Sequence, residues 1–162
     1  MKIKKYKKLT NVGALSKEKS KLTRWFNLYV RLRDMEVTED GKVYYLCCAC
    51  GRRVDVTLFS TREIYNGKDH HASHYFNSDK YPAVEYNEDN VNLSCKQCNR
   101  RLHGNKDAYE INLMKKIGED RFANLCVAKQ RIWKPGILEI IDLEEEYKRK
   151  AKAEAERLGI KI

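Results

Sequence analysis

Four cysteines in two Cys-x-x-Cys pairs have the spacing of a metal site. The pairs are Cys47 with Cys50 and Cys95 with Cys98. Each pair places two thiolates close enough to chelate one tetrahedral ion, and four soft sulfur ligands favour zinc over magnesium or calcium. We expect a structural zinc site that joins the segment before residue 47 to the segment after residue 95. A reversible disulfide or separately buried thiols are the alternatives, and Cys48 could replace Cys47 as a ligand.

Between these pairs and just after them lie residues suited to phosphodiester hydrolysis. That reaction needs a base that activates water and a cation that neutralises charge on the phosphate. Histidine titrates near neutral pH, and an asparagine carbonyl is a hard oxygen ligand for Mg²⁺ or Mn²⁺. His74 lies between the pairs, Asn90 precedes the second pair, and Asn99 follows it. A histidine and an asparagine clamped together by zinc would supply both parts of a nuclease centre.

Residues 47–104 resemble the HNH, or ββα-metal, endonucleases that are reinforced by two Cys-x-x-Cys pairs. In that family a histidine ends the first strand, an asparagine lies in the loop before the second pair, and a histidine or asparagine follows its last cysteine. His74, Asn90 and Asn99 occupy those positions. The resemblance implies an α+β fold with a zinc-stabilised ββα-metal (HNH) core at about 43–104, embedded in a mainly helical small domain.

A second resemblance covers more of the chain. Residues 21–34, 72–75, 86–90 and 95–102 are similar to the phage recombination proteins of the NinG (Rap) family. That family is regarded as structure-specific endonucleases that act on branched recombination intermediates such as Holliday junctions and D-loops. The resemblance implies branched DNA as the partner, metal-dependent hydrolysis, and a cytoplasmic protein encoded by a phage or prophage in a bacterial host.

The resemblance also implies a role for each site residue. His74 would be the general base, Asn99 would hold the catalytic Mg²⁺ or Mn²⁺, and Asn90 would fix the loop that orients the histidine. Many HNH sites carry an aspartate directly before the base as a second metal ligand, and here Ser73 stands in that position. The Ser73 hydroxyl, His103 or water alone could replace that ligand. His103 follows Asn99 at helical spacing, which would place both on one face of a helix.

Local patterns predict the elements that would position these residues. Apolar residues at spacings of three and four predict an amphipathic helix at about 16–33, and the Asp40-Gly41 turn precedes a β-favouring run at 42–46. Strands are expected at 71–76 and 83–86, where alternation would put His70 on the face of His74, and a turn is expected at 66–67. The second cysteine pair is expected to open a helix at 95–103, and Asn105 can cap the next helix. A long charged helix follows residue 136, which could pack on the domain, pack on a second copy or project outward.

The charge balance favours a polyanionic partner. The chain has 33 lysines and arginines against 23 acidic residues, a formal net charge of +10. Nucleic acid or an acidic membrane surface would suit this charge. We find neither a run of membrane-spanning length nor the apolar core of a signal peptide, which indicates an intracellular protein that does not span a membrane. Lys96, Arg100 and Arg101, with Lys4 and Lys5 of the basic start, are the candidates for contacts to DNA phosphates.

We divide the chain into a flexible basic arm at 1–14, a NinG-like domain at 15–134 and a charged C-terminal helix at 135–162. Two chains could cooperate as a homodimer. The main alternative to a nuclease is a zinc-stabilised DNA-binding module without catalysis, acting in recombination or regulation. A protein-interaction adaptor is a third function, and it predicts no salt-dependent DNA affinity.

Overall fold

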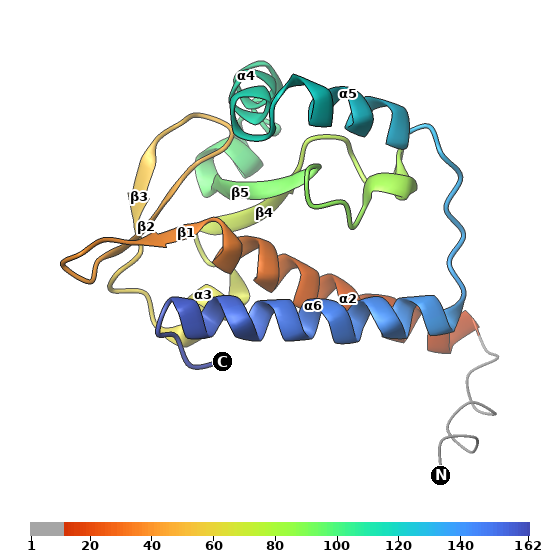
Figure 1. Ribbon diagram of the computed structural model, residues 1–162, viewed down its shortest axis with the longest axis horizontal. Coiled ribbons are helices and arrows are strands. Elements are labelled where there is room, and N and C mark those ends of the chain that lie inside the picture. Colours follow the sequence, from red (N-terminus) through yellow and green to blue (C-terminus); the bar gives the residue numbers. More distant parts are fainter. Residues whose placement is uncertain (1–11) are drawn as a thin grey trace, which may run out of the picture.

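The computed structural model describes residues 12–162 and arranges them in three layers (Figure 1). The long helices α2 (Val12–Arg33) and α6 (Ile137–Arg157) form one layer, and α4 (Lys106–Ile117) with α5 (Glu119–Ala128) forms another. Between them lies the antiparallel pair of strands β4 (His70–His74) and β5 (Val91–Cys95). The other elements are β1 (Met35–Val37), β2 (Val43–Leu46), β3 (Arg53–Asp55), α3 (Thr61–Asn66) and the short helical turns η1 (Pro82–Val84) and η2 (Gln97–Arg101). The prediction of a mixed α+β fold is confirmed at this level.

Helices α2 and α6 run side by side in the same direction (Figure 1). Phe26 of α2 meets Tyr147 of α6 edge to face, with ring centroids 4.7 Å apart. At the far end, Arg157 donates hydrogen bonds to the backbone oxygens of Leu32 and Met35 at 3.0 and 2.9 Å. The helix predicted at 16–33 is present and begins earlier, at Val12. The C-terminal helix packs on the rest of its own chain, the first of the three placements that the sequence left open.

The small sheet β1–β2–β3 carries the first cysteine pair. Strand β2 pairs antiparallel with both neighbours, so that Tyr44 lies opposite Glu36 of β1 and Asp55 of β3. The turn between β1 and β2 contains Gly41 at φ +78°, a conformation that glycine adopts without steric cost. Strand β2 confirms the strand predicted at 42–46, and it ends directly before Cys47.

Strand β5 is buried along its whole length because both of its faces are covered. Arg33 of α2 donates to the Val91 oxygen at 3.0 Å, and Lys116 of α4 donates to Asn92 Oδ1 at 2.8 Å. The sequence of β5, from Val91 to Cys95, nevertheless alternates apolar and polar residues, the period typical of a strand. The predicted helix at 95–103 was therefore wrong at its start: Cys95 ends β5, and the helical turn η2 begins at Gln97. The strand predicted at 71–76 is present as β4.

One further local prediction was wrong, and one was right only in part. Residues 83–86 do not form a strand, because Pro82 has no N–H for a sheet ladder and instead opens the turn η1. The turn expected at 66–67 is the end of helix α3, where Gly67 closes the helix at φ +68°. Helix α3 begins with a capping box between Ser60 and Glu63, a signal that the sequence contained and that we did not use.

Helices α4 and α5 cover the face of the β4–β5 pair that lies away from α2. Asn105 precedes α4 as predicted, but its side chain does not cap the helix: Nδ2 donates to the Ala49 oxygen at 3.2 Å instead. Tyr109 and Leu113 of α4 are fully buried against the strands. Within residues 12–162, no helix is long and apolar enough to cross a membrane.

Candidate functional site

The four predicted cysteine ligands come together at one point. The ligand atoms of Cys47, Cys50, Cys95 and Cys98 all lie within 4.8 Å of one another. Sulfur ligands about 2.3 Å from a tetrahedral zinc are separated by about 3.8 Å, so the cluster fits one ion with little adjustment. The four thiols could hold a metal such as zinc. No disulfide joins these cysteines, and all four are free thiols.

The surrounding backbone prepares this cluster for anionic sulfur. The Cys95 amide donates to Cys47 Sγ at 3.2 Å, which ties the end of β5 to the loop after β2. The Asn105 amide group approaches Cys98 Sγ at 3.9 Å. Gly51 has φ +71° and donates to the Cys47 oxygen at 2.7 Å, so the chain folds back tightly around the first pair. Hydrogen bonds of this kind stabilise thiolates that bind a metal.

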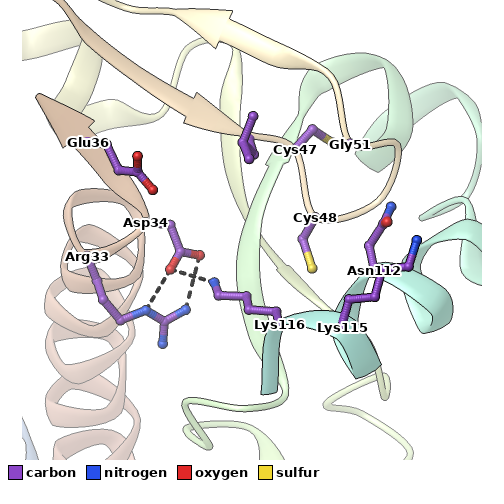
Figure 2. A pocket seen from close by; sticks show the side chains of 10 residues that line it. Arg33, Asp34, Glu36, Cys47, Cys48, Gly51, Asn112, Lys115 and Lys116 are labelled. Carbon is purple, nitrogen blue, oxygen red and sulfur yellow. Dashed lines mark hydrogen bonds and ion pairs between the residues drawn. The ribbon is translucent and has the colours of Figure 1, made fainter. Parts of the chain in front are cut away.

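Cys48 is not part of the cluster. It lines a different cleft of about 390 Å³, between the end of α2, the loop after β2 and helix α4 (Figure 2). Burial raises the pKa of the Cys48 thiol to about 12, so the group stays neutral near pH 7. Of the two possible ligands in the first pair, the structure therefore places Cys47 at the metal site.

A buried carboxylate holds this cleft together. Asp34 accepts hydrogen bonds from Arg33 at 2.8 Å and from Lys116 at 2.7 Å (Figure 2). It also accepts one from the Leu93 amide at 2.8 Å. Burial alone would raise the pKa of Asp34, but Arg33 and Lys116 lower it below its usual value. The ion cluster joins α2, β5 and α4, and it fixes the layers around the strands.

Loss of the Asp34 charge is expected to destabilise the fold. In Asp34→Asn, Arg33 and Lys116 would lose their shared counter-charge, and the free energy of unfolding should fall by about 3 kcal/mol. Urea unfolding of the zinc-loaded protein measures this change. Glu36→Gln is the matched control, because Glu36 lines the same cleft but is exposed and should change stability by less than about 0.5 kcal/mol. Equal effects of the two variants would contradict the role of the cluster.

His74 and Asn99 line one hollow of about 270 Å³. His74 comes from the end of β4, and Asn99 comes from the turn η2. Further residues that line the hollow are Ala72, Ser73, Asn77, Ser78, His103, Gly104 and Lys106. The hollow therefore brings together most of the residues predicted for catalysis.

The imidazole of His74 has a defined tautomer. Its Nε2 lies 2.9 Å from the Glu85 backbone oxygen, which can only accept a hydrogen bond, so Nε2 carries the proton. The lone pair is then on Nδ1. Burial lowers the pKa of His74, and the bond to Glu85 offsets this only in part. A neutral imidazole with a free nitrogen is a competent proton acceptor.

Asn90 is fully buried and fixes the loop that follows His74. Its Oδ1 accepts from the Phe76 amide at 2.7 Å, and its Nδ2 donates to the oxygens of Phe76 and Val84 at 3.0 and 2.8 Å. This amide lies in the core of the loop and does not line the hollow. These bonds hold the backbone of the loop that follows His74.

Ser73 touches Asn99 directly. The buried Ser73 hydroxyl donates to Asn99 Oδ1 at 2.8 Å, which orients the amide and leaves a second lone pair on that oxygen. His103 also lines the hollow, but it is not on the same helix as Asn99. The turn η2 ends at Arg101, and His103 follows it in the left-handed conformation, at φ +47°. His70 does not line the hollow of His74; it is buried at the other end of β4, and its Nε2 lies 3.3 Å from the Ile64 oxygen.

The sequence interpretation missed Lys106. It extends from the first turn of α4 and lines the hollow, where its Nζ lies 3.0 Å from the His74 oxygen and also contacts the Tyr75 oxygen. An ammonium group has three donors, so one remains after these two bonds. No motif marks a lysine at this distance from the histidine, and only the packing of α4 against β4 reveals it.

The predicted DNA-binding residues lie in different places. Lys96, Arg100 and Arg101 are all exposed, but none of them lines the hollow of His74. Lys96 and Arg101 line a separate hollow of about 300 Å³ together with Arg52, which the sequence interpretation did not include. Lys4 and Lys5, and most of the predicted basic arm, lie outside the described residues 12–162.

Comparisons with known proteins place the chain in a family. Searches of curated proteins and of solved structures return no match. A family model described as the bacteriophage lambda NinG protein matches residues 1–157. That match spans nearly the entire chain, from the basic start to the end of α6. The chain therefore belongs to the NinG family of phage proteins.

Proposed function

We propose that this protein is a metal-dependent DNA endonuclease of the HNH type that hydrolyses phosphodiester bonds in branched recombination intermediates. The observation that carries the proposal is the shared hollow, in which the free Nδ1 of His74 and the oriented amide of Asn99 lie together. A purely structural histidine would have both ring nitrogens in hydrogen bonds or in the core. The strand pair β4–β5 followed by the turn η2 supports the HNH comparison, because it supplies the two residues from the expected elements.

In the proposed reaction His74 Nδ1 takes a proton from water, and the water oxygen attacks phosphorus. The bond from phosphorus to the leaving sugar oxygen then breaks, and that oxygen takes up a proton. Glu85 keeps the ring in the required tautomer through its backbone oxygen. Asn90 holds the loop that carries this contact.

The residues around the hollow fit a divalent ion such as Mg²⁺ or Mn²⁺. Asn99 Oδ1 would bind the ion through the lone pair that is not used by the Ser73 hydroxyl. Ser73 and His103 would be further metal ligands. The ion would supply positive charge against the phosphate. Because Ser73 donates its proton to Asn99, its main effect would be to orient that ligand.

The cysteine cluster would hold a structural zinc ion with no part in the chemistry. Four sulfur ligands close the coordination sphere and leave no position for water or substrate. By joining the end of β2 to the start of η2, the ion would fix Asn99 relative to His74. Lys96, Arg100, Arg101 and Arg52 would contact phosphates without reading bases. A homodimer that cuts opposing strands stays a prediction.

A cleavage assay tests the proposal. Zinc-loaded protein should cut labelled four-way junction or forked DNA faster than linear duplex when Mg²⁺ or Mn²⁺ is added, and should not cut without the divalent ion. If no substrate is cut under any of these conditions while salt-dependent DNA binding is observed, the protein is the non-catalytic DNA-binding module. If DNA binding is also absent, it is a protein-interaction adaptor.

Lys106 is expected to contact the phosphate that enters the hollow. In Lys106→Met the slope of log Kd against log salt should become shallower by about 0.9, because one phosphate contact is lost. Fluorescence anisotropy over a salt series measures this slope. Lys115→Met removes an equal charge near the other end of α4, outside the hollow, and is the control. If the slope becomes shallower to the same extent in both variants, Lys106 has no specific place at the reacting phosphate.

A further inference from the structure

Two aromatic rings and two lysines form a surface beside the hollow of His74. We call Phe76, Tyr81, Lys80 and Lys129 the aromatic–lysine surface. The rings of Phe76 and Tyr81 meet edge to face with centroids 5.7 Å apart. The Lys129 ammonium lies 4.0 Å from the Phe76 centroid and 5.3 Å from that of Tyr81, and the Lys80 ammonium lies 5.3 Å from the Tyr81 centroid. The surface thus combines π-faces with positive charge.

Lysine ammonium groups lie over both rings, which also pack partly against the core, where Phe76 meets Tyr75 at a centroid distance of 4.6 Å. Phe76 and Tyr81 are partly exposed, and the groups over their faces are lysine ammonium groups from the loop and from the end of α5. An ammonium over a ring at such a site contributes only about 0.5–1 kcal/mol and stays hydrated. It can therefore move aside for a planar group that stacks better on the ring.

The loop that carries the rings is rigidly built. The side-chain amide of Asn90 accepts a hydrogen bond from the Phe76 N–H and donates one to the Phe76 oxygen. Asn77 accepts through Oδ1 from the amides of Asp79 and Lys80 at 2.8 and 3.1 Å, and its backbone oxygen accepts from the Tyr81 amide at 2.9 Å. Because Asn77 also lines the hollow of His74, the rings are held in place directly beside it.

We propose that the aromatic–lysine surface binds an unpaired nucleotide next to the phosphate at His74. The base would stack on Tyr81 or Phe76, while Lys80 and Lys129 would turn to the flanking phosphates. Asp79 is the acidic residue between Phe76 and Tyr81, where it lies beside Lys80, and Lys106 and Lys129 add further positive charge. Bases in a duplex have their faces covered by neighbouring pairs, so the surface selects DNA with an unpaired strand at the cleavage point. The inference deepens the proposed function and rests on it for the position of the phosphate.

Binding without cleavage tests this inference. Zinc-loaded protein is titrated, with no Mg²⁺ or Mn²⁺ added, into labelled single-stranded DNA, a hairpin duplex and a duplex with a single-stranded flap. Tyr81→Leu should weaken binding to the single strand and the flap by about 5- to 100-fold, the effect of losing one stacked base, and leave duplex binding unchanged. Phe76→Leu should act in the same direction.

Tyr44→Leu is the matched control, because Tyr44 is also partly exposed with a cation over its ring, Arg53 at 3.7 Å, but lies on β2 away from the hollow. Zinc content and circular dichroism establish that each variant is folded; if Phe76→Leu fails this check, Tyr81→Leu decides alone. Equal losses for Tyr44→Leu and Tyr81→Leu, or equal losses on duplex and single strand, would overturn the inference. If Tyr81→Leu selectively weakens binding to unpaired DNA but the wild-type protein cuts no DNA, the nucleotide-binding surface is supported and the proposed nuclease activity is rejected.

Discussion

His74→Ala should reduce the rate of DNA cleavage by about 10³-fold while zinc content and DNA affinity stay near those of the wild type. The reason is that Nδ1 is the one free basic atom that the proposed reaction uses, and general-base catalysis contributes about 10² to 10⁴ in rate. Single-turnover cleavage of a branched substrate in Mg²⁺ measures the loss, and anisotropy on the same substrate measures binding. The two readouts separate a catalytic role from a structural one.

His71→Ala is the control for this experiment. His71 lies on the same strand, its pKa is also lowered by burial, and it does not line the hollow. It should leave the cleavage rate close to that of the wild type. A His74→Ala protein that cuts as fast as His71→Ala would show that another group activates the water, and the assignment of the base would have to be abandoned.

Cys47→Ala should release the bound metal and unfold the domain, whereas Cys48→Ala should retain about one zinc per chain and stay folded. The substituted residues are adjacent and both buried, but only Cys47 belongs to the four-sulfur cluster. Structural zinc contributes on the order of 10 kcal/mol to small domains, which is comparable with the whole stability of a typical fold. Removal of the ion by a chelator should have the same effect as Cys47→Ala.

Elemental analysis, circular dichroism and urea unfolding measure these outcomes. A Cys47→Ala protein that keeps its metal and its fold would reject the zinc assignment. Wild-type protein isolated with disulfides among these cysteines would reject it as well. If Cys48→Ala also lost the ion, the first pair would bind through a different sulfur from the one that the structure places in the cluster.

The sequence alone was sufficient where neighbours along the chain decide the outcome. The spacing of the cysteine pairs is a local property, and it correctly named the four residues that cluster. The apolar period of helix α2 and the run that forms β2 are local in the same sense. His74, Asn99 and Ser73 were also named from motif positions, and the structure brings them into one hollow.

Sequence-based predictions failed where a strand period was not used or where backbone chemistry overrode the pattern. Residues 91–95 alternate apolar and polar as a strand does, yet a helix was predicted to begin at Cys95, the last residue of β5. Pro82 turned an expected strand into η1. His70 lies on the same strand as His74, but it packs at the end of helix α3 and does not line the hollow.

What only the tertiary structure decided is which distant side chains meet. The choice between Cys47 and Cys48, the contact of Lys106 with the end of β4, and the rings of Phe76 and Tyr81 under Lys129 depend on residues far apart in the sequence. Spacing fixes the geometry of neighbours because the backbone joins them directly, whereas contacts between layers are set by how whole elements pack. The sequence therefore determined which residues are chemically suited to a candidate metal site and to the proposed nuclease centre, and packing determined how they are placed and what lies beside them.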